Sequence, residues 1–252
     1  KRKAPNFKKI SGMKLKEVYK SSPFGVVSSF LIGISHSAVF SLIAVYATSM
    51  NFSILEVSIV TFLFAISGAI SQWPIGKLSD VLDRRIVIIY TTFGAALFCF
   101  LAIISSGQMY MPAGLATSKL FFYICIMCFS FCSLPMFALI FAHTNDFIPK
   151  EKFVAAGAGL QFVFGLGAIC GPFMCSLFME FLGENGFFIF LIIFHSFIGL
   201  FGIYRMQIRE SGDNPDSQFA PMPQTITPAG IELNPSTEPI DEPNNLNEFK
   251  KI

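Results

Sequence analysis

Long apolar stretches alternate with short polar ones along most of the chain. The hydrocarbon core of a bilayer is about 30 Å thick, so a helix needs roughly 20 apolar residues to cross it. Glycine or proline can interrupt such a helix where its neighbours satisfy the backbone. The pattern predicts an all-α membrane protein with one six-helix bundle over 21–206. Six stretches are long enough, at about 24–47, 54–75, 86–106, 118–144, 153–180 and 185–204.

Both ends of the chain differ from this bundle. Residues 1–20 hold eight Lys and Arg residues, and we interpret them as a basic cytoplasmic linker. Residues 210–252 hold seven of the chain's 14 prolines and eight of its 16 acids, with no apolar period. We therefore predict a disordered cytoplasmic tail over 207–252. Because the first residue is Lys1, we expect a piece of a longer protein or a natural half.

Basic residues occur in every second connection. Short loops on the cytoplasmic side of a membrane are enriched in Lys and Arg. The predicted loops near 48–53, 107–117 and 181–184 hold none. This alternation predicts that both termini are cytoplasmic. The loops between them hold Lys77, Arg84, Arg85, Lys150 and Lys152, and Arg205 and Arg209 follow the last span.

Composition agrees with a membrane protein and excludes several other classes. Charged residues make up 13% of the chain, against about 25% in soluble domains. A net charge of +2 gives no basis for nucleic-acid binding. All six cysteines lie in apolar runs, and no His or acid lies near Cys125, Cys128 and Cys132. We expect packing cysteines, with no disulfide framework, metal or cofactor.

The connection after the second predicted span carries a motif, GKLSDVLDRR over 76–85. Gly76 allows a helix to end in a tight turn. Asp80 can pair with an arginine or cap a helix. Arg84 and Arg85 are expected to begin the next helix. From the residues alone, an ordinary tight loop with topology-setting charges remains an alternative.

This motif resembles the signature loop of the major facilitator superfamily, Gly-x-Leu-(Ala/Ser)-Asp-x-x-x-Arg-(Arg/Lys). Val81 departs from the usual Arg or Lys, and Asp83 from the usual Gly. In that family the loop follows the second helix and, in degenerate form, the eighth. The resemblance implies that this chain supplies helices seven to twelve, one half of a 6+6 bundle. The partner would be a missing N-terminal six-helix half.

Two further segments support the resemblance. Gly167, Gly171 and Pro172 in the fifth span are similar to the Gly-Pro motif of antiporters in this superfamily, and small residues four apart permit close helix packing. Residues 142–146, together with the glycine-rich run at 165–168 and the proline-rich tail, resemble the YcaD-like branch. The resemblance covers 20–240.

The family's mechanism implies a gate and a substrate route. In alternating access, one half rocks against the other around a site near the midplane. By resemblance, Asp80 contacts the partner half, and Arg84 or Arg85 pairs with Asp146 at the end of the fourth span. Surface ion pairs worth about 0–1 kcal/mol are the alternative reading of these charges.

Polar residues at membrane depth are the candidates for substrate or proton contact. They are His36 and Phe40 in the first span and Gln161 in the fifth. His195 in the last span and His143 at the end of the fourth are weaker candidates. No Asp, Glu, Lys or Arg lies at mid-span, so a coupling carboxylate is expected in the missing half. A satisfied packing histidine is the alternative for His36.

The expected function is secondary active transport of a small organic solute. Proton coupling, efflux and a bacterial inner membrane are further expectations. The chain lacks a phosphate-binding loop for an ATP-driven pump and the clustered His and acid residues of an intramembrane enzyme, so no catalytic residues are expected. A six-span receptor or scaffold, or a half-transporter that dimerises, stays open.

Overall fold

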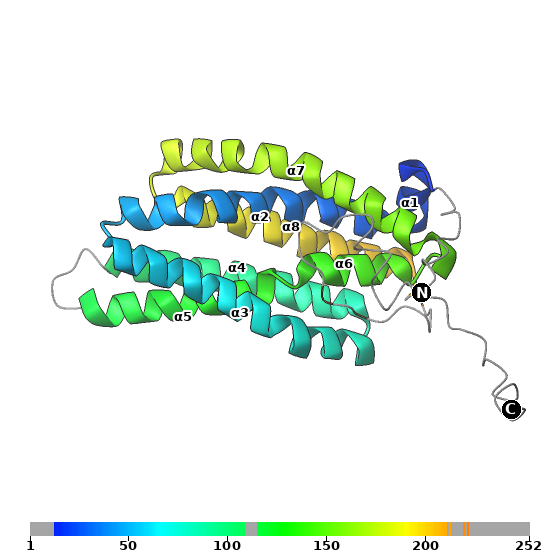
Figure 1. The fold of residues 1–252 in the computed structure, drawn as a ribbon, viewed down its shortest axis with the longest axis horizontal. Helices are drawn as coiled ribbons and strands as arrows, with labels where there is room; N and C mark the ends of the chain where they lie inside the picture. The colour runs from blue at the N-terminus through cyan, green and yellow to red at the C-terminus, as the bar shows by residue number, and fades with distance from the viewer. Residues whose placement is uncertain (1–12, 109–114, 211, 213–218, 220, 222–252) are drawn as a thin grey trace, which may run out of the picture.

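The computed structural model describes residues 13–108, 115–210, 212, 219 and 221, and it is all-α in these parts (Figure 1). Six segments are long and apolar enough to cross a membrane, with α5 and α6 together forming the fourth. The predicted tail beyond 221 and the first 12 residues lie outside the described parts. The helices are α1 Leu15–Ser21, α2 Pro23–Ser49, α3 Ile54–Val81, α4 Arg84–Gln108, α5 Leu115–Ser133, α6 Met136–Asn145, 3-10 helix η1 Lys150–Lys152, α7 Phe153–Leu182 and α8 Gly186–Ile208.

Three details differ from the sequence prediction. The end of the predicted linker is a helix, α1, because Val18 is fully buried against the start of α7. The span at 118–144 is divided at Pro135, which has no N–H to continue the hydrogen-bond ladder. α3 continues to Val81, so Gly76 and Asp80 lie in its last turns, and Gly76 does not end the helix.

The helices pack with an internal two-fold pattern. The first triplet is α2, α3 and α4, and the second is α5–α6, α7 and α8. α2 packs along α7, and α5 packs along α3. The third helices, α4 and α8, pack against each other (Figure 1). Each triplet runs the length of the bundle three times, so the second triplet begins at the opposite end of the bundle from the first. The two triplets are therefore inverted repeats.

Large apolar side chains are exposed along α3 and α7, the least buried of the spans. An apolar surface of this extent needs lipid or another protein surface to cover it. The exposed side chains include Phe62, Ile66, Ile70 and Trp73 on α3, and Phe162, Leu166, Ile169 and Phe173 on α7.

Glycine brings α2 and α7 close together. A Cβ on Gly33 would clash with the backbone of Phe164, and one on Gly167 would clash with the Phe30 carbonyl. A Cβ on Gly171 would clash with the Ile34 carbonyl. The glycines predicted for helix packing therefore lie where the two backbones approach, and Pro172 follows within α7.

We expect Gly167→Ala to destabilise the bundle by about 1–3 kcal/mol, because the methyl group would meet backbone rather than a movable side chain. Gly165→Ala is the matched control on the same helix, since no atom lies within 4 Å of its added Cβ. The measurement is the midpoint of thermal unfolding in detergent. Equal midpoints for the two variants would contradict the packing role of Gly167.

Candidate functional site

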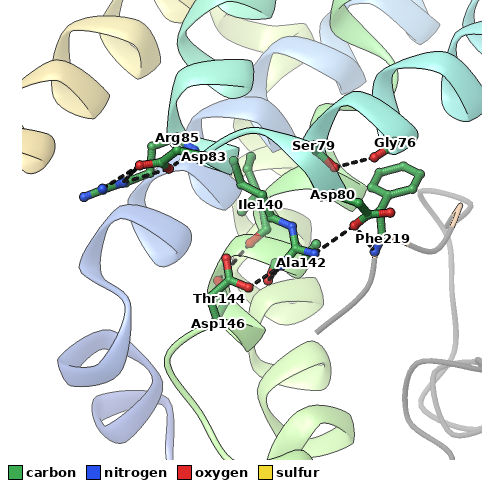
Figure 2. A network of polar contacts seen from close by, with 11 residues as sticks. Gly76, Ser79, Asp80, Asp83, Arg85, Ile140, Ala142, Thr144, Asp146 and Phe219 are labelled. Atoms are coloured by element: carbon green, nitrogen blue, oxygen red, sulfur yellow. Dashed lines mark hydrogen bonds and ion pairs between the residues drawn. The ribbon is translucent and has the colours of Figure 1, made fainter. Parts of the chain in front are cut away.

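Arg84, the first residue of α4, joins three helix ends. Its Nη2 donates to Asp80 Oδ1 of α3 at 2.9 Å, and its Nη1 donates to Asp146 Oδ1 after α6 (Figure 2). Nη1 also lies 3.4 Å from the Ala142 carbonyl oxygen. The side chains of Arg84 and Asp146 are 9% exposed, whereas that of Asp80 is 38% exposed. The pair is therefore buried, with Asp80 at its open edge.

Arg85 belongs to a different cluster. Asp83 accepts from the Arg85 backbone N–H at 2.9 Å and from Arg85 Nη2 at 2.7 Å. Arg85 Nη1 donates to the Arg209 carbonyl, 2.6 Å away. Of the two arginines proposed to meet Asp146, the structure brings Arg84 to it. Asp83, which the sequence reading treated only as a departure from the motif, caps α4 and holds Arg85.

Phe219, a described residue of the C-terminal region, lies against the same helix end. Its backbone N–H donates to Asp80 Oδ1 at 2.9 Å, and its ring lies against Gly76 (Figure 2). A Cβ on Gly76 would overlap this ring. Gly76 thus provides room for Phe219. The sequence gives a signal only for the glycine, since Phe219 is 143 positions further along the chain.

A second polar cluster lies inside the bundle at the break between α5 and α6. His36 Nε2 lies 3.1 Å from the Ser133 carbonyl oxygen and 3.1 Å from Ser133 Oγ. The carbonyl can only accept, so Nε2 is the donor. His195 Nδ1 lies 2.9 Å from the Leu191 carbonyl and donates to it for the same reason. Its Nε2 therefore accepts from Ser133 Oγ, 2.8 Å away.

His36 thus has a clear structural role. Ser133 ends α5, so its carbonyl is one of those without a partner inside the helix. His36 of α2 supplies that partner, and Gln72 Nε2 of α3 lies 3.5 Å from the next carbonyl, Leu134. Side chains from neighbouring helices satisfy an interrupted membrane helix in this way. His36 itself is 1% exposed.

The other two substrate candidates lie apart from this cluster. Phe40 is 54% exposed and contacts Phe64 of α3 edge-on. Gln161 is half-buried on α7. His143 is buried between the rings of Phe24 and Phe147, at the opposite end of α6 from the break.

Comparison with known families agrees with this architecture. The family model of the Major Facilitator Superfamily matches residues 25–239. The chain belongs to the major facilitator superfamily. It is therefore an integral, multi-pass membrane protein of a family of transporters, which are not enzymes and which act on a substrate across a lipid bilayer.

Several bacterial relatives are similar to the chain. An uncharacterised MFS-type transporter of Yersinia enterocolitica is 23% identical over 201 residues, which are 80% of this chain and 47% of the relative. One of Bacillus subtilis is 26% identical over 183 residues, 69% of this chain and 43% of the relative. The chain spans about half the length of the curated relatives it matches. No solved structure gives a significant match.

We expect Asp146→Asn to destabilise the protein by about 3 kcal/mol or more, because it leaves the buried Arg84 guanidinium with a weaker partner. Lys119→Gln breaks the more exposed pair with Glu56, in which both side chains are 24% exposed, and should cost at most about 1 kcal/mol. Thermal unfolding of the purified variants tests this. An Asp146→Asn midpoint equal to that of Lys119→Gln would refute it.

The helix break gives a separate expectation for His36. His36→Ala leaves the Ser133 carbonyl unsatisfied and should cost about 1–3 kcal/mol. His36→Gln keeps an amide N–H at a similar distance from the backbone and should recover most of that loss. Stability of both variants is measured by heating in detergent. If Gln were as damaging as Ala, the hydrogen bond to the break would not be what His36 contributes.

Proposed function

We propose that the chain is the C-terminal half of a secondary transporter of the YcaD-like branch. It would move a small organic solute by alternating access, with proton coupling and in the efflux direction. Six spans in two inverted triplets, and a match to about half of each relative, support the assignment to one half. The exposed faces of α3 and α7 would then lie against the N-terminal half or lipid.

We also propose that the basic end of the bundle faces the cytoplasm. This end holds the start of α2, α4 and α7 and the end of α3, α6 and α8. Ten of the eleven Lys and Arg residues in the described part of the chain lie there, and Lys119 lies at the other end. The positive-inside rule gives such an end a cytoplasmic orientation. The bacterial relatives support the proposal of a bacterial inner membrane.

The observation that supports the gate best is the bridge from Asp80 through Arg84 to Asp146. It ties the ends of α3, α4 and α6 into one unit. Asp80 is the more exposed acid of the two, so it is placed to contact the partner half in one state and release it in the other. We propose that Gly76, Asp80, Arg84, Arg85 and Asp146 form the cytoplasmic gate, with Arg85 acting through Asp83.

The substrate route is proposed to pass along the side of α2 that carries Phe40. Phe40 is exposed in this half and would face the partner or the solute. Gln161 would contribute a polar contact from α7. His36 would take part only through the cluster at the helix break, where a proton or solute would have to compete with Ser133. A coupling carboxylate is proposed to lie in the partner half.

Asp80→Asn should lower transport by about tenfold, the value of one charge-assisted hydrogen bond, while membrane abundance stays near that of the parent. The assay is uptake and efflux of a panel of small organic compounds in vesicles that carry the full-length protein, with and without a pH gradient. Lys77→Gln is the matched control, since it removes a charge three residues away in α3 without touching Arg84 or Asp146. Parallel loss of transport and abundance in Asp80→Asn would reduce Asp80 to a structural role. If gradient-driven movement of every compound were absent for the folded parent, proton-coupled transport of this class of solute would be rejected.

A further inference from the structure

A small pocket at the basic end lies beside the proposed gate and shares Arg85 with it. It is formed where the start of α2, the start of α4, the segment that ends α6 and the end of α8 meet. None of its lining residues comes from α3 or α7, the two least buried spans. The residues with polar or charged side chains that line it are Ser22, Arg85, His143, Arg205 and Arg209.

Positive charge exceeds negative charge around this pocket. Arg85 is paired with Asp83. The Arg205 side chain makes no ion pair or hydrogen bond with a described residue. Arg209 lies 4.0 Å from the centroid of the Phe147 ring and donates to the Ser21 carbonyl. Burial, with the nearby charges of Arg205 and Arg85, lowers the pKa of Arg209. Three guanidinium groups thus line the pocket, only that of Arg85 has an ion pair among the described residues, and an anion would offset their repulsion.

His143 is a second and independent indication of a ligand. Its side chain is only 3% exposed and lines the pocket. The Phe24 and Phe147 rings contact it edge-on, with centroids at 5.2 and 5.1 Å. Within the described residues, neither of its ring nitrogens has a hydrogen-bond partner. Because the His143 side chain lines the pocket, its imidazole N–H can donate to a group bound there.

The helix ends around the pocket also favour an anion. α2 is 27 residues long and begins at Pro23, and its positive end faces this region. Ser22 caps it by accepting from the Gly25 N–H at 3.1 Å, which leaves the Ser22 hydroxyl proton as a donor. Helix N-termini with nearby arginines are suited to phosphate groups.

We propose that this pocket binds a phosphate group, with Arg205 and Arg209 as the charged ligands and His143 and Ser22 as hydrogen-bond donors. The group would come from an anionic phospholipid head group at the bilayer surface or from a soluble phosphate. Basic pockets between membrane helices bind anionic head groups in other proteins. Arg85 lines the pocket and also belongs to the proposed gate, whereas the proposed ligands Ser22, His143, Arg205 and Arg209 do not.

The test uses the purified full-length protein in a neutral detergent. Native mass spectrometry counts retained phosphatidylglycerol against phosphatidylcholine. Thermal unfolding is followed in parallel against inorganic phosphate and against chloride at equal ionic strength. Arg205→Gln is the first variant, because it breaks no ion pair or side-chain hydrogen bond with a described residue. His143→Phe is the second, because it keeps the ring packing and removes the nitrogens. Lys77→Gln is the control for loss of one charge at the same end.

We expect saturable binding of at least one phosphate source by the parent and by Lys77→Gln. Arg205→Gln should weaken it roughly tenfold, the value of one charge-assisted hydrogen bond. Retention of phosphatidylglycerol without an effect of inorganic phosphate would assign the site to a lipid, and the reverse would assign it to a soluble phosphate. The proposal is overturned if the parent retains phosphatidylglycerol no better than phosphatidylcholine and is stabilised no more by inorganic phosphate than by chloride. It is also overturned if Arg205→Gln and His143→Phe bind as tightly as Lys77→Gln.

Discussion

Hydrocarbon offers no hydrogen bonds, so each polar group inside the bundle depends on another part of the protein. This constraint is clearest at Pro135, where the fourth span breaks. The carbonyls of Ser133 and Leu134 are reached by His36 of α2 and Gln72 of α3. His195 of α8 closes the cluster through Ser133 Oγ. Hydrogen bonds thus join four spans at the break in the fourth span, where its own backbone hydrogen-bond ladder is interrupted.

The same constraint explains how charge is distributed. Arg84 and Asp146 are both nearly buried, and each is tolerable there because the other is present. Asp83 likewise forms an ion pair with the buried Arg85, and it also caps α4. The two adjacent arginines, Arg84 and Arg85, therefore have different structural roles. One joins the ends of three helices, and the other is turned toward α8 and the pocket beside His143.

Close packing of α2 on α7 gives the bundle its geometry. Where Gly33 and Gly167 let the backbones approach, Ser29 of α2 also donates to the Leu160 carbonyl at 2.8 Å. The corresponding contact in the two-fold pattern, α5 on α3, uses a serine hydroxyl in the same way. Ser67 donates to the Met127 carbonyl at 2.6 Å. Small and hydroxyl-bearing residues favour such contacts because apolar side chains gain little by leaving lipid for another helix. In this two-fold pattern α3 and α7 are corresponding helices, and they are the least buried spans.

Hydropathy alone determined the number and order of the spans, because the bilayer imposes a length that local composition must meet. The spacing of lysine and arginine determined which helix ends lie together, and the 76–85 motif indicated the family. Only the tertiary structure decided which arginine meets Asp146, that Gly76 makes room for Phe219, and that His36 serves the helix break. Those choices depend on contacts between residues 62 to 143 positions apart, such as Arg84 with Asp146 or Gly76 with Phe219. Their directions are set by helix packing, which no local pattern records.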